Sequence, residues 1–374
     1  MEEINTQVTN APDQSKHTKH LIIRSVIVIV GVLFIQLALA ACYLYAFHAP
    51  KAKDVPIAVV GQASQVQTIV DNIKNQSDGA YTISILATRA EAEQQIKERK
   101  IYSAYIPSIQ GSEVLVATAT SKTLSQGFAQ IFAALDTSYQ KNLRLVLSAD
   151  PLTAAQAELP IVSAKITDLA ALPDGDTNGL AMFYTAFAFV FGGYLVSVAL
   201  NIIRGDRKFF NRNAILRLIA LAIFSVVSGF LVAILATKGV HALPDSYLWK
   251  VAGIGALAAF GVSTFSSALI SIFGTIGAGI VILLFVVLGT PASGGPMPIL
   301  LTGEGPWRWI APYLPTGASL DAIRQTVYFD NIKIMQHLWV LIGYAAVGTI
   351  GLLSLGLRNS TVSFYEEDIK HSDE

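Results

Sequence analysis

The longest stretch without a charged side chain, residues 251–303, reads VAGIGALAAFGVSTFSSALISIFGTIGAGIVILLFVVLGTPASGGPMPILLTG. A membrane-crossing helix needs about 20 mostly apolar residues, because each residue rises 1.5 Å through a hydrocarbon core of about 30 Å. The stretch is longer than one crossing, and small residues around Gly274 interrupt it. It therefore predicts two spans, over residues 251–270 and 275–290.

Four further segments have the same composition. They contain no Asp, Glu, Lys or Arg and are long enough to cross a membrane: 25–47, 180–203, 218–237 and 338–357. Of the 374 residues, 53% are hydrophobic and 14% are charged, whereas a soluble domain carries about 25% charged residues. The sequence therefore predicts an α-helical polytopic membrane protein with six transmembrane helices.

The direction of the spans is predicted by Lys and Arg, which short cytoplasmic loops retain. The loop between the second and third spans contains Arg204, Arg207, Lys208, Arg212 and Arg217. This loop is therefore predicted to be cytoplasmic, and so are the tails 1–24 and 358–374. Segments 48–179 and 291–337 are then predicted to lie on the outer side of the cell membrane.

The chain has one cysteine, Cys42, which excludes an intrachain disulfide or a cysteine-based metal cluster. The residues that end at this cysteine, Leu-Ala-Ala-Cys, look like a bacterial lipoprotein cleavage box. However, the apolar run continues to Phe47 and is longer than the apolar region of a typical signal peptide. We therefore favour an uncut first span and keep lipidation at Cys42 as the alternative.

Residues 48–179 differ from the rest of the chain, because charges of both signs occur there at ordinary density. Short runs rich in apolar and β-branched residues predict strands at 55–60, 81–86, 102–106 and 114–117. Apolar or charged residues at helical spacing predict helices at 63–73, 91–100 and 123–147. This alternation predicts an extracytoplasmic α/β domain inserted between the first two spans, linked back to the membrane by a segment marked by Pro160 and Pro173.

The carboxylates of this domain do not suggest a catalytic pair. Acidic and basic residues, Arg99 among them, mix along 91–100, which is the pattern of a solvated helix face with surface ion pairs. Asp174 and Asp176 flank a glycine in a predicted turn, but two acids are too few for a calcium loop.

Motifs for other chemistry are missing from the sequence. There is no GxxxxGK[ST] phosphate-binding loop, no HExxH zinc motif and no GxSxG nucleophile motif. The 26 basic and 26 acidic residues balance, which gives no reason to expect nucleic-acid binding. The predicted spans contain no Asp, Glu, Lys or Arg, which disfavours an ion-coupled carrier. We therefore assign no catalytic, cofactor-binding or metal-binding residue and predict no enzyme activity.

Small residues recur in the predicted spans and favour close packing of helices over substrate contact. The glycines concerned are Gly192, Gly193, Gly253, Gly261, Gly348 and Gly351.

Two loop segments carry more specific information. Residues 204–217 mix cations with Phe209 and Phe210, so this segment either lies in the membrane interface or simply anchors the chain by its charge. The second segment follows the fifth span, where Gly and Pro interrupt the helix and Trp and Tyr suit the headgroup layer. Beyond it, residues 318–329 predict a short helix with a local ion pair between Asp321 and Arg324.

In this order, these features resemble the ABC-2 type transporter permease family, particularly its branch of phage infection protein (Pip)-like membrane proteins. One span, a large outer α/β domain and a five-span block at 180–357 match over nearly the whole chain. The most specific local match is the Pro-Ala-Ser-Gly-Gly run at 291–295, followed by 309–317 with its Leu-Pro-Thr-Gly end.

The resemblance implies a permease subunit that forms a homodimer or heterodimer within membrane lipid and works with a separate ABC ATPase. The ATPase-coupling loop would comprise Arg204, Arg207, Lys208, Phe209, Phe210, Arg212 and Arg217. The outer gate segment would comprise Pro291, Gly294, Gly295, Trp307, Trp309, Pro315 and Gly317. The expected activity is export of a hydrophobic, lipid-linked or peptide-like substrate. The alternative is a non-transporting surface receptor or secretion scaffold that acts through its outer domain.

Overall fold

The computed structural model describes residues 14–149, 162–202, 214–302 and 305–372. Within them, six helical segments are long and apolar enough to cross a membrane: Ile29–Phe47, Ala181–Asn201, Ala214–Gly239, Asp245–Phe273, Thr275–Ala292 and Ile334–Gly356. Each overlaps one of the predicted spans, so the prediction of six helices is confirmed. Helices are expected here because the bilayer core offers no water to the backbone, which must satisfy its own hydrogen bonds.

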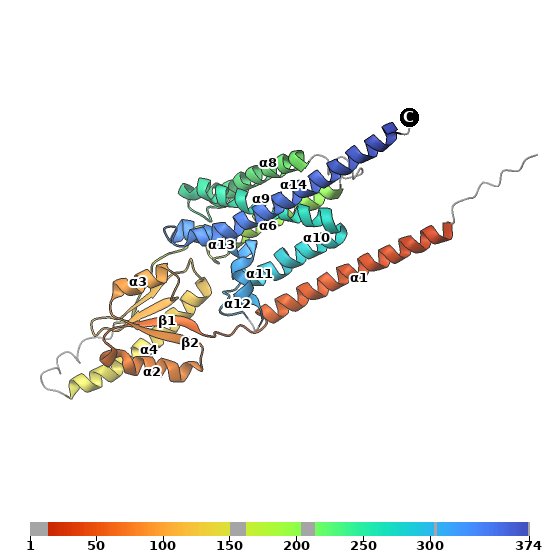
Figure 1. Cartoon of the computed structure of the whole chain (residues 1–374). Coiled ribbons are helices and arrows are strands. Elements are labelled where there is room, and N and C mark those ends of the chain that lie inside the picture. The colour runs from red at the N-terminus through yellow and green to blue at the C-terminus, as the bar shows by residue number, and fades with distance from the viewer. Residues whose placement is uncertain (1–13, 150–161, 203–213, 303–304, 373–374) are drawn as a thin grey trace, which may run out of the picture.

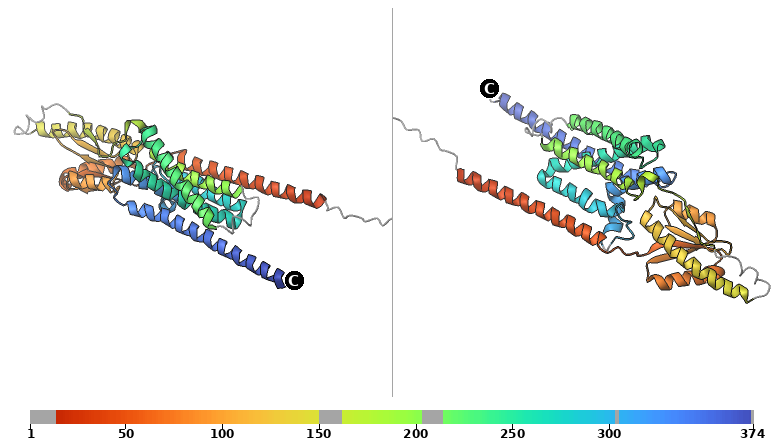
Figure 2. Two further views of the ribbon diagram at one scale, coloured as in Figure 1. Left: turned by 90° about the horizontal axis from the view of Figure 1, so that it is seen from above. Right: turned by 180° about the vertical axis from the view of Figure 1, so that it is seen from behind.

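The helices form a bundle around one central member (Figure 1). The helices of the spans are α1 (Gln14–Phe47), α6 (Ala181–Ile202), α8 (Ala214–Ile234), α9 (Leu248–Phe273), α14 (Ile334–Ser372) and the shorter α10 (Thr275–Ile282), whose span continues to Ala292. Helix α9 contacts α6, α8, α10 and α14. Short elements join them: π-helical turns η2 (Leu235–Gly239) and η4 (Leu283–Leu288), 3₁₀ turns η1 (Asp174–Asp176) and η3 (Asp245–Tyr247), and α11 (Gly289–Ala292). Helix α1 contacts the bundle mainly at η4, and Figure 2 shows α1 and α14 on different flanks.

Glycines let several of these helices approach closely. A Cβ atom at Gly193 would lie 2.7 Å from the carbonyl oxygen of Ala259, and one at Gly261 would lie 2.9 Å from that of Leu341. These distances are too short for a real Cβ, so the packing interpretation holds at both positions. At Gly253, in contrast, a Cβ would meet nothing within 4 Å.

A five-stranded sheet lies between α1 and α6 in the chain. Its strands are β1 (Val55–Val60), β2 (Tyr81–Leu86), β3 (Ser103–Ile106), β4 (Glu113–Val116) and β5 (Lys165–Asp168), in the order β2-β1-β3-β4-β5. Only the β3–β4 pair is antiparallel, and Val55 pairs with Tyr81 where β1 meets β2. The helices of this sheet domain are α2 (Ala63–Ser77), α3 (Arg89–Lys97) and α4 (Lys122–Ser148).

The two faces of the sheet are covered differently. Side chains of α2 and α4, including Val66, Phe128 and Phe132, form one core with β1, β3 and β4. Helix α3 covers the other face, where Ala92 and Ile96 belong to a second cluster. The first four strands were predicted to within one residue at each end, because their apolar runs are strong local signals.

The fifth strand was not predicted. Strand β5 lies between Pro160 and Pro173, where the sequence suggested only a linker. Its four residues, KITD, contain two charges and a single large apolar side chain, so no local pattern marks them. It exists because it pairs in parallel with β4, and because Asp168 accepts hydrogen bonds from the amide (3.1 Å) and hydroxyl (2.6 Å) of Thr118.

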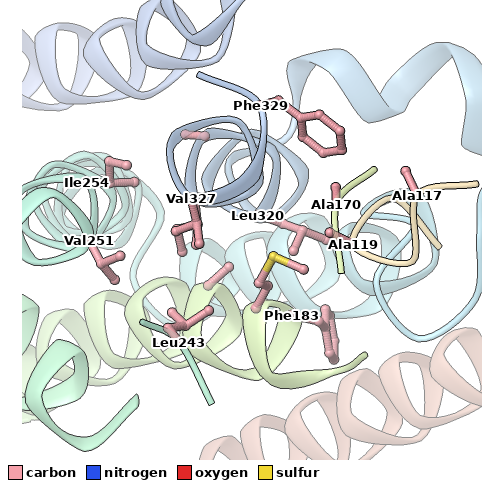
Figure 3. Close-up of a cluster of buried hydrophobic side chains, with 14 of the residues drawn as sticks. Ala117, Ala119, Ala170, Phe183, Leu243, Val251, Ile254, Leu320, Val327 and Phe329 are labelled. Atoms are coloured by element: carbon pink, nitrogen blue, oxygen red, sulfur yellow. The ribbon is translucent and has the colours of Figure 1, made fainter. Parts of the chain in front are cut away.

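One hydrophobic core joins the sheet domain to the helices. Figure 3 shows Ala119 and Ala170, from loops at the end of the sheet, close to Phe183 of α6 and Leu320. All four side chains are at least 93% buried. The sheet domain is therefore packed onto the membrane helices rather than held only by its two connecting segments.

Candidate functional site at the junction of the sheet domain and the helices

The junction is built on a buried helix that follows the fifth span. The segment after α11 forms α12 (Trp307–Ile310), η5 (Ala311–Tyr313) and α13 (Pro315–Tyr328). Pro315 occupies the first turn of α13, where a missing N–H costs nothing and the fixed φ angle suits a helix. Every residue of α13 except Asp321 and Tyr328 is buried. Helix α13 contacts α6, α9 and α14, and is thus enclosed by the bundle and the sheet domain.

The structure brings most of the predicted gate residues to the start of α13. Pro291 is buried in α11, and Gly294 has a φ of +67°, a left-handed conformation that favours glycine. A Cβ atom at Gly295 would overlap the ring of Phe183. At Gly317, a Cβ would lie 3.2 Å from the carbonyl oxygen of Ala311.

The two tryptophans of the gate segment differ in their surroundings. Trp307 is 4% exposed and packs inward, whereas Trp309 is 69% exposed. Tyr313 and Trp339 are similarly exposed, at 71% and 63%. Exposed aromatic side chains at one end of a bundle are typical of the lipid headgroup layer.

A charged cluster lies where α13 meets the sheet domain. The Asp321 carboxylate accepts a hydrogen bond from Nη1 of Arg324 at 2.5 Å and another from Nη1 of Arg99 at 2.9 Å. Nε of Arg324 donates to the carbonyl oxygen of Ala119 at 3.0 Å. The predicted Asp321–Arg324 pair is confirmed. The interpretation of Arg99 as a solvated surface residue is wrong, because its guanidinium reaches α13 from the turn that follows α3.

The protonation states of this cluster are set by burial and by its own charges. Burial raises the pKa of Asp321, but the adjacent Arg99 and Arg324 outweigh this effect and keep the pKa below its ordinary value. Burial lowers the pKa of Arg324, whose own charge is also opposed by Arg99. Asp321 therefore stays ionised at neutral pH, and both arginines share its negative charge.

Two further cations bridge the junction through backbone carbonyls. Nζ of Lys333, in the turn between α13 and α14, donates to the carbonyl oxygen of Glu98 at 3.0 Å. Nη2 of Arg308 donates to the carbonyl oxygen of Lys53 at 2.9 Å. The Glu98 carboxylate is instead paired with Lys100 at 2.6 Å. Among the described residues, neither Lys333 nor Arg308 has a carboxylate within salt-bridge distance.

These groups surround a cavity of about 340 Å³. Its lining comes from the sheet domain, from the loop after α11, from α13 and from the first turn of α14. The charged or polar residues in the lining are Glu98, Arg99, Tyr102, Thr120, Ser293, Arg308, Asp321, Arg324, Gln325, Lys333, Gln336 and His337, and the gate residues Gly294 and Gly317 complete it. In the part of the chain that the structure describes, no cluster of His, Cys, Asp and Glu could hold a metal ion.

The predicted coupling loop lies largely outside the described residues. This applies to Arg204, Arg207, Lys208, Phe209, Phe210 and Arg212. The seventh residue, Arg217, was assigned to the loop and is instead part of α8, where it is 2% exposed. Its Nη1 donates to Oγ of Ser271 at 2.9 Å, which joins the first turn of α8 to the last turn of α9. Figure 1 shows that α8 begins at the end of the bundle remote from the sheet domain.

Arg217 also corrects the prediction that the spans contain no ionisable group. A cation is retained inside this helical segment because a neighbouring helix offers it a hydrogen-bonding partner. The sequence did not show this, since Arg217 borders the charge-free run.

Sequence reasoning missed most of the charged junction. Arg99, Lys333 and His337 come from three separate segments and were not linked by any local pattern. The one available signal was the return of charge between the last two spans, at Asp321 and Arg324, within a segment otherwise suited to burial.

Comparison with known protein families finds a match over residues 23–354 to the family described as ABC-2 family transporter protein. The matched range includes all six candidate spans apart from the last residues of the sixth, and also the sheet domain and the junction. No curated protein matches the chain.

Proposed function

The chain belongs to the ABC-2 family of transporter proteins, and on this premise we propose that it is the permease subunit of an exporter driven by a separate ATPase. The observation that carries the proposal is the extent of the family match, which covers the bundle and the junction together. Members of this family are the membrane subunits of transporters and normally pair with an ABC ATPase. The proposed cargo is a hydrophobic, lipid-linked or peptide-like molecule.

We propose that both termini are cytoplasmic and that the sheet domain lies outside the cell membrane. The cations at 204–217 support this orientation through the positive-inside tendency. The ATPase would then bind at the end of the bundle remote from the sheet domain. Pairing of two permease subunits and closer kinship with the Pip-like branch belong to the same proposal, the latter supported by the motifs at 291–295 and 314–317.

The packing of α9 suggests how motion would cross the membrane. Its 26 residues span about 39 Å at 1.5 Å per residue. One end holds Ser271, which binds Arg217 beside the proposed coupling loop, and the other end holds Val251 and Ile254, which belong to the same core as Leu320 of α13 (Figure 3). A displacement of α8 against α9 would therefore reach α13 through direct contacts.

Photocrosslinking in the native membrane tests the ATPase partnership. A photoreactive residue at Phe209 or Phe210 is expected to capture an ABC-type ATPase, which mass spectrometry of the product would identify. Trp249 provides the matched control, because it is 73% exposed at the opposite end of the bundle. Capture at all three positions, or capture only of lipid by a correctly inserted protein, would contradict the proposal.

A receptor or scaffold function is favoured by a separate observation. A cavity of about 1200 Å³ lies between α2 and α4 on the sheet domain, lined in part by Ile69, Ile131 and Leu135. A receptor would keep its activity when Arg204, Arg207, Lys208 and Arg212 are replaced by Gln. An exporter would lose transport in this variant. The variant with all four replacements therefore distinguishes the two functions.

A further inference from the structure

We propose that the cavity at the junction is a binding site for a phosphate-type anion. It is lined by four cations and two carboxylates, which leaves a formal charge of four minus two, or +2. The cations are Arg99, Arg308, Arg324 and Lys333, and the acids are Glu98 and Asp321. A phosphate monoester or hydrogenphosphate, with a charge between −1.5 and −2 near neutral pH, would neutralise this excess.

The ion pairs inside the cluster do not neutralise all the cations that line the cavity. Asp321 is the only carboxylate that pairs with a lining cation in the described structure, and it is shared by Arg99 and Arg324. Glu98 pairs with Lys100, which does not line the cavity. Among the described residues, Lys333 donates its hydrogen bond to a carbonyl oxygen, which offers a partial charge, and the Glu98 carboxylate acts on it from beyond salt-bridge distance.

Buried polar atoms in the lining lack partners, which also indicates a ligand. Nε of Arg99, Oε1 of Gln325 and Oγ1 of Thr120 are inaccessible to solvent and have no hydrogen-bond partner among the described residues. Gln325 as a whole is 1% exposed. A buried polar group without a partner costs free energy, so such groups in native proteins usually mark a water, an ion or a ligand. A rotation of either side chain would turn these atoms towards the cavity, where hydrogenphosphate offers acceptors to Arg99 and a hydroxyl donor to Gln325.

The size and place of the cavity suit such a group. Its volume of about 340 Å³ falls at the lower end of the range of roughly 300–1,000 Å³ for small-molecule sites. Its exposed lining residues, including Pro312 and Gln336, are within three positions in the sequence of the exposed aromatic residues Tyr313 and Trp339. The shared chemistry is therefore a phosphate group that arrives either free in water or as the head of a lipid.

A bound anion would act as a bridge between the two parts of the protein. Arg99 belongs to the sheet domain, whereas Arg324 and Lys333 belong to α13 and the turn after it. Phosphate oxygens accept charge-assisted hydrogen bonds from several cations at once, and guanidinium groups match them in pairs. Binding does not depend on an ATPase, so this inference stands or falls separately from the proposed export function.

The rate of amine labelling at Lys333 provides a local test. The full chain is purified in maltoside detergent, which contains no phosphate, and is reductively methylated with inorganic phosphate or with chloride at equal ionic strength. We expect saturating phosphate to slow labelling of Lys333 at least fivefold, as measured by mass spectrometry. Lys238, exposed and outside the cavity, is the internal reference and should be unaffected.

A second arm identifies the source of the phosphate group. Micelles supplemented with phosphatidic acid are compared with micelles containing diacylglycerol, the matched lipid without phosphate. Protection by free phosphate supports a soluble ligand, and protection by phosphatidic acid alone supports a lipid head. Absence of protection in both arms, or equal protection of Lys238, would overturn the proposal.

Thermal unfolding of variants completes the test. Lys333→Gln should raise the apparent Kd for the effective phosphate source about tenfold, since one charge-assisted hydrogen bond is lost, while Lys238→Gln should not change it. Lys333 has a φ of +61°, and Gln leaves this backbone constraint as it is. Arg99→Gln is the second variant and should weaken binding similarly. Unchanged affinity in both cavity variants would contradict the site.

Discussion

At the scale of single residues, Asp136 organises the interior of the sheet domain. It is 1% exposed, and its carboxylate accepts hydrogen bonds from the hydroxyls of Tyr105 (2.7 Å) and Ser112 (2.5 Å) and from Nε2 of Gln140 (2.9 Å). Gln140 also donates to the carbonyl oxygen of Val162, ahead of β5. The network thus fixes α4 against β3 and against the strand that no sequence pattern marked.

Asp136→Ala should destabilise the sheet domain by about 2–4 kcal/mol, because it leaves several buried donors without an acceptor. Hydrogen exchange of β3 and α4 peptides in the full chain would measure the loss of protection. Asp71→Ala is the matched control, since Asp71 is exposed and, within the described ranges, accepts a side-chain hydrogen bond only from Gln67 on the same helix. A loss of similar size in the control would show that the network is not the cause.

Glu113 should make the pairing of β4 dependent on pH. Its carboxylate accepts hydrogen bonds from Arg89 at 2.8 Å and from Thr167 of β5 at 2.6 Å, and these lower its pKa to about 2. A lowered pKa contributes stability that is present above the unfolded value, about 4.5, and that is lost as the pH falls towards 2.

Hydrogen exchange of β4 and β5 in the wild type and in Glu113→Gln, compared at matched pH, tests this dependence. The protection lost in the variant should be largest at pH 6–7 and should shrink as the pH falls from about 4.5 towards 2, because the unfolded chain, whose Glu113 has the higher pKa, is protonated first. A difference between the two proteins that does not vary with pH would contradict the role of the charge.

At the scale of elements, helix packing depends on glycines in particular places. A Cβ at Gly348 of α14 would overlap backbone atoms of α9 at Phe265, whereas a Cβ at Gly343 of the same helix would meet nothing within 4 Å. Close packing of α14 against α9 therefore requires a glycine at position 348 but not at position 343.

Gly348→Ala should destabilise the bundle by about 1–3 kcal/mol, because α14 must move away from α9 to accommodate the methyl group. Gly343→Ala should be neutral or slightly stabilising, since alanine is the better helix former. Thermal unfolding of both variants in detergent, followed by size-exclusion chromatography, would separate them. Equal loss in both would mean that helix propensity, not packing, decides the outcome.

The elements that could be predicted are those with a strong local signal. Charge-free runs of about 20 residues are nearly unambiguous as spans. Strands β1, which is mostly apolar, and β2, which alternates polar and apolar residues, have bounds that matched the prediction. Strand β5 could not be predicted, because its pairing with β4 and its bonds to Thr118 are contacts made by tertiary structure. The same limit applies to Arg99, whose partner Asp321 lies 222 residues away.

At the scale of the whole molecule, the junction couples the sheet domain to the helices through both core and charge. Arg308 and Arg324 donate hydrogen bonds to backbone carbonyls of the sheet domain, and Arg99 of the sheet domain donates to Asp321 of α13. The sequence predicted that the sheet domain and the gate segment lie on the same side of the membrane. It did not predict that both line one cavity, because this depends on how the sheet domain packs against the helices.

A double-mutant cycle with Arg99→Gln and Asp321→Asn should reveal a coupling free energy of about 1–3 kcal/mol between the two residues. Thermal unfolding of the full chain in detergent would give the four stabilities. Arg99→Gln should also broaden the distribution of distances between spin labels at Gln67 and Met335, which are exposed on the sheet domain and on α14. Cys42→Ser provides the background for labelling. Additive effects with an unchanged distance distribution would contradict coupling through this pair.

The insertion of the sheet domain between α1 and α6 affects how it can unfold. If the domain loses its structure while both helices stay in the bilayer, its chain becomes a closed loop rather than a free coil. Loop closure lowers the conformational entropy of the unfolded chain, by an amount that grows with the logarithm of loop length. The bilayer therefore acts on this domain much as a covalent crosslink would, and stabilises it without any additional contact in the native state.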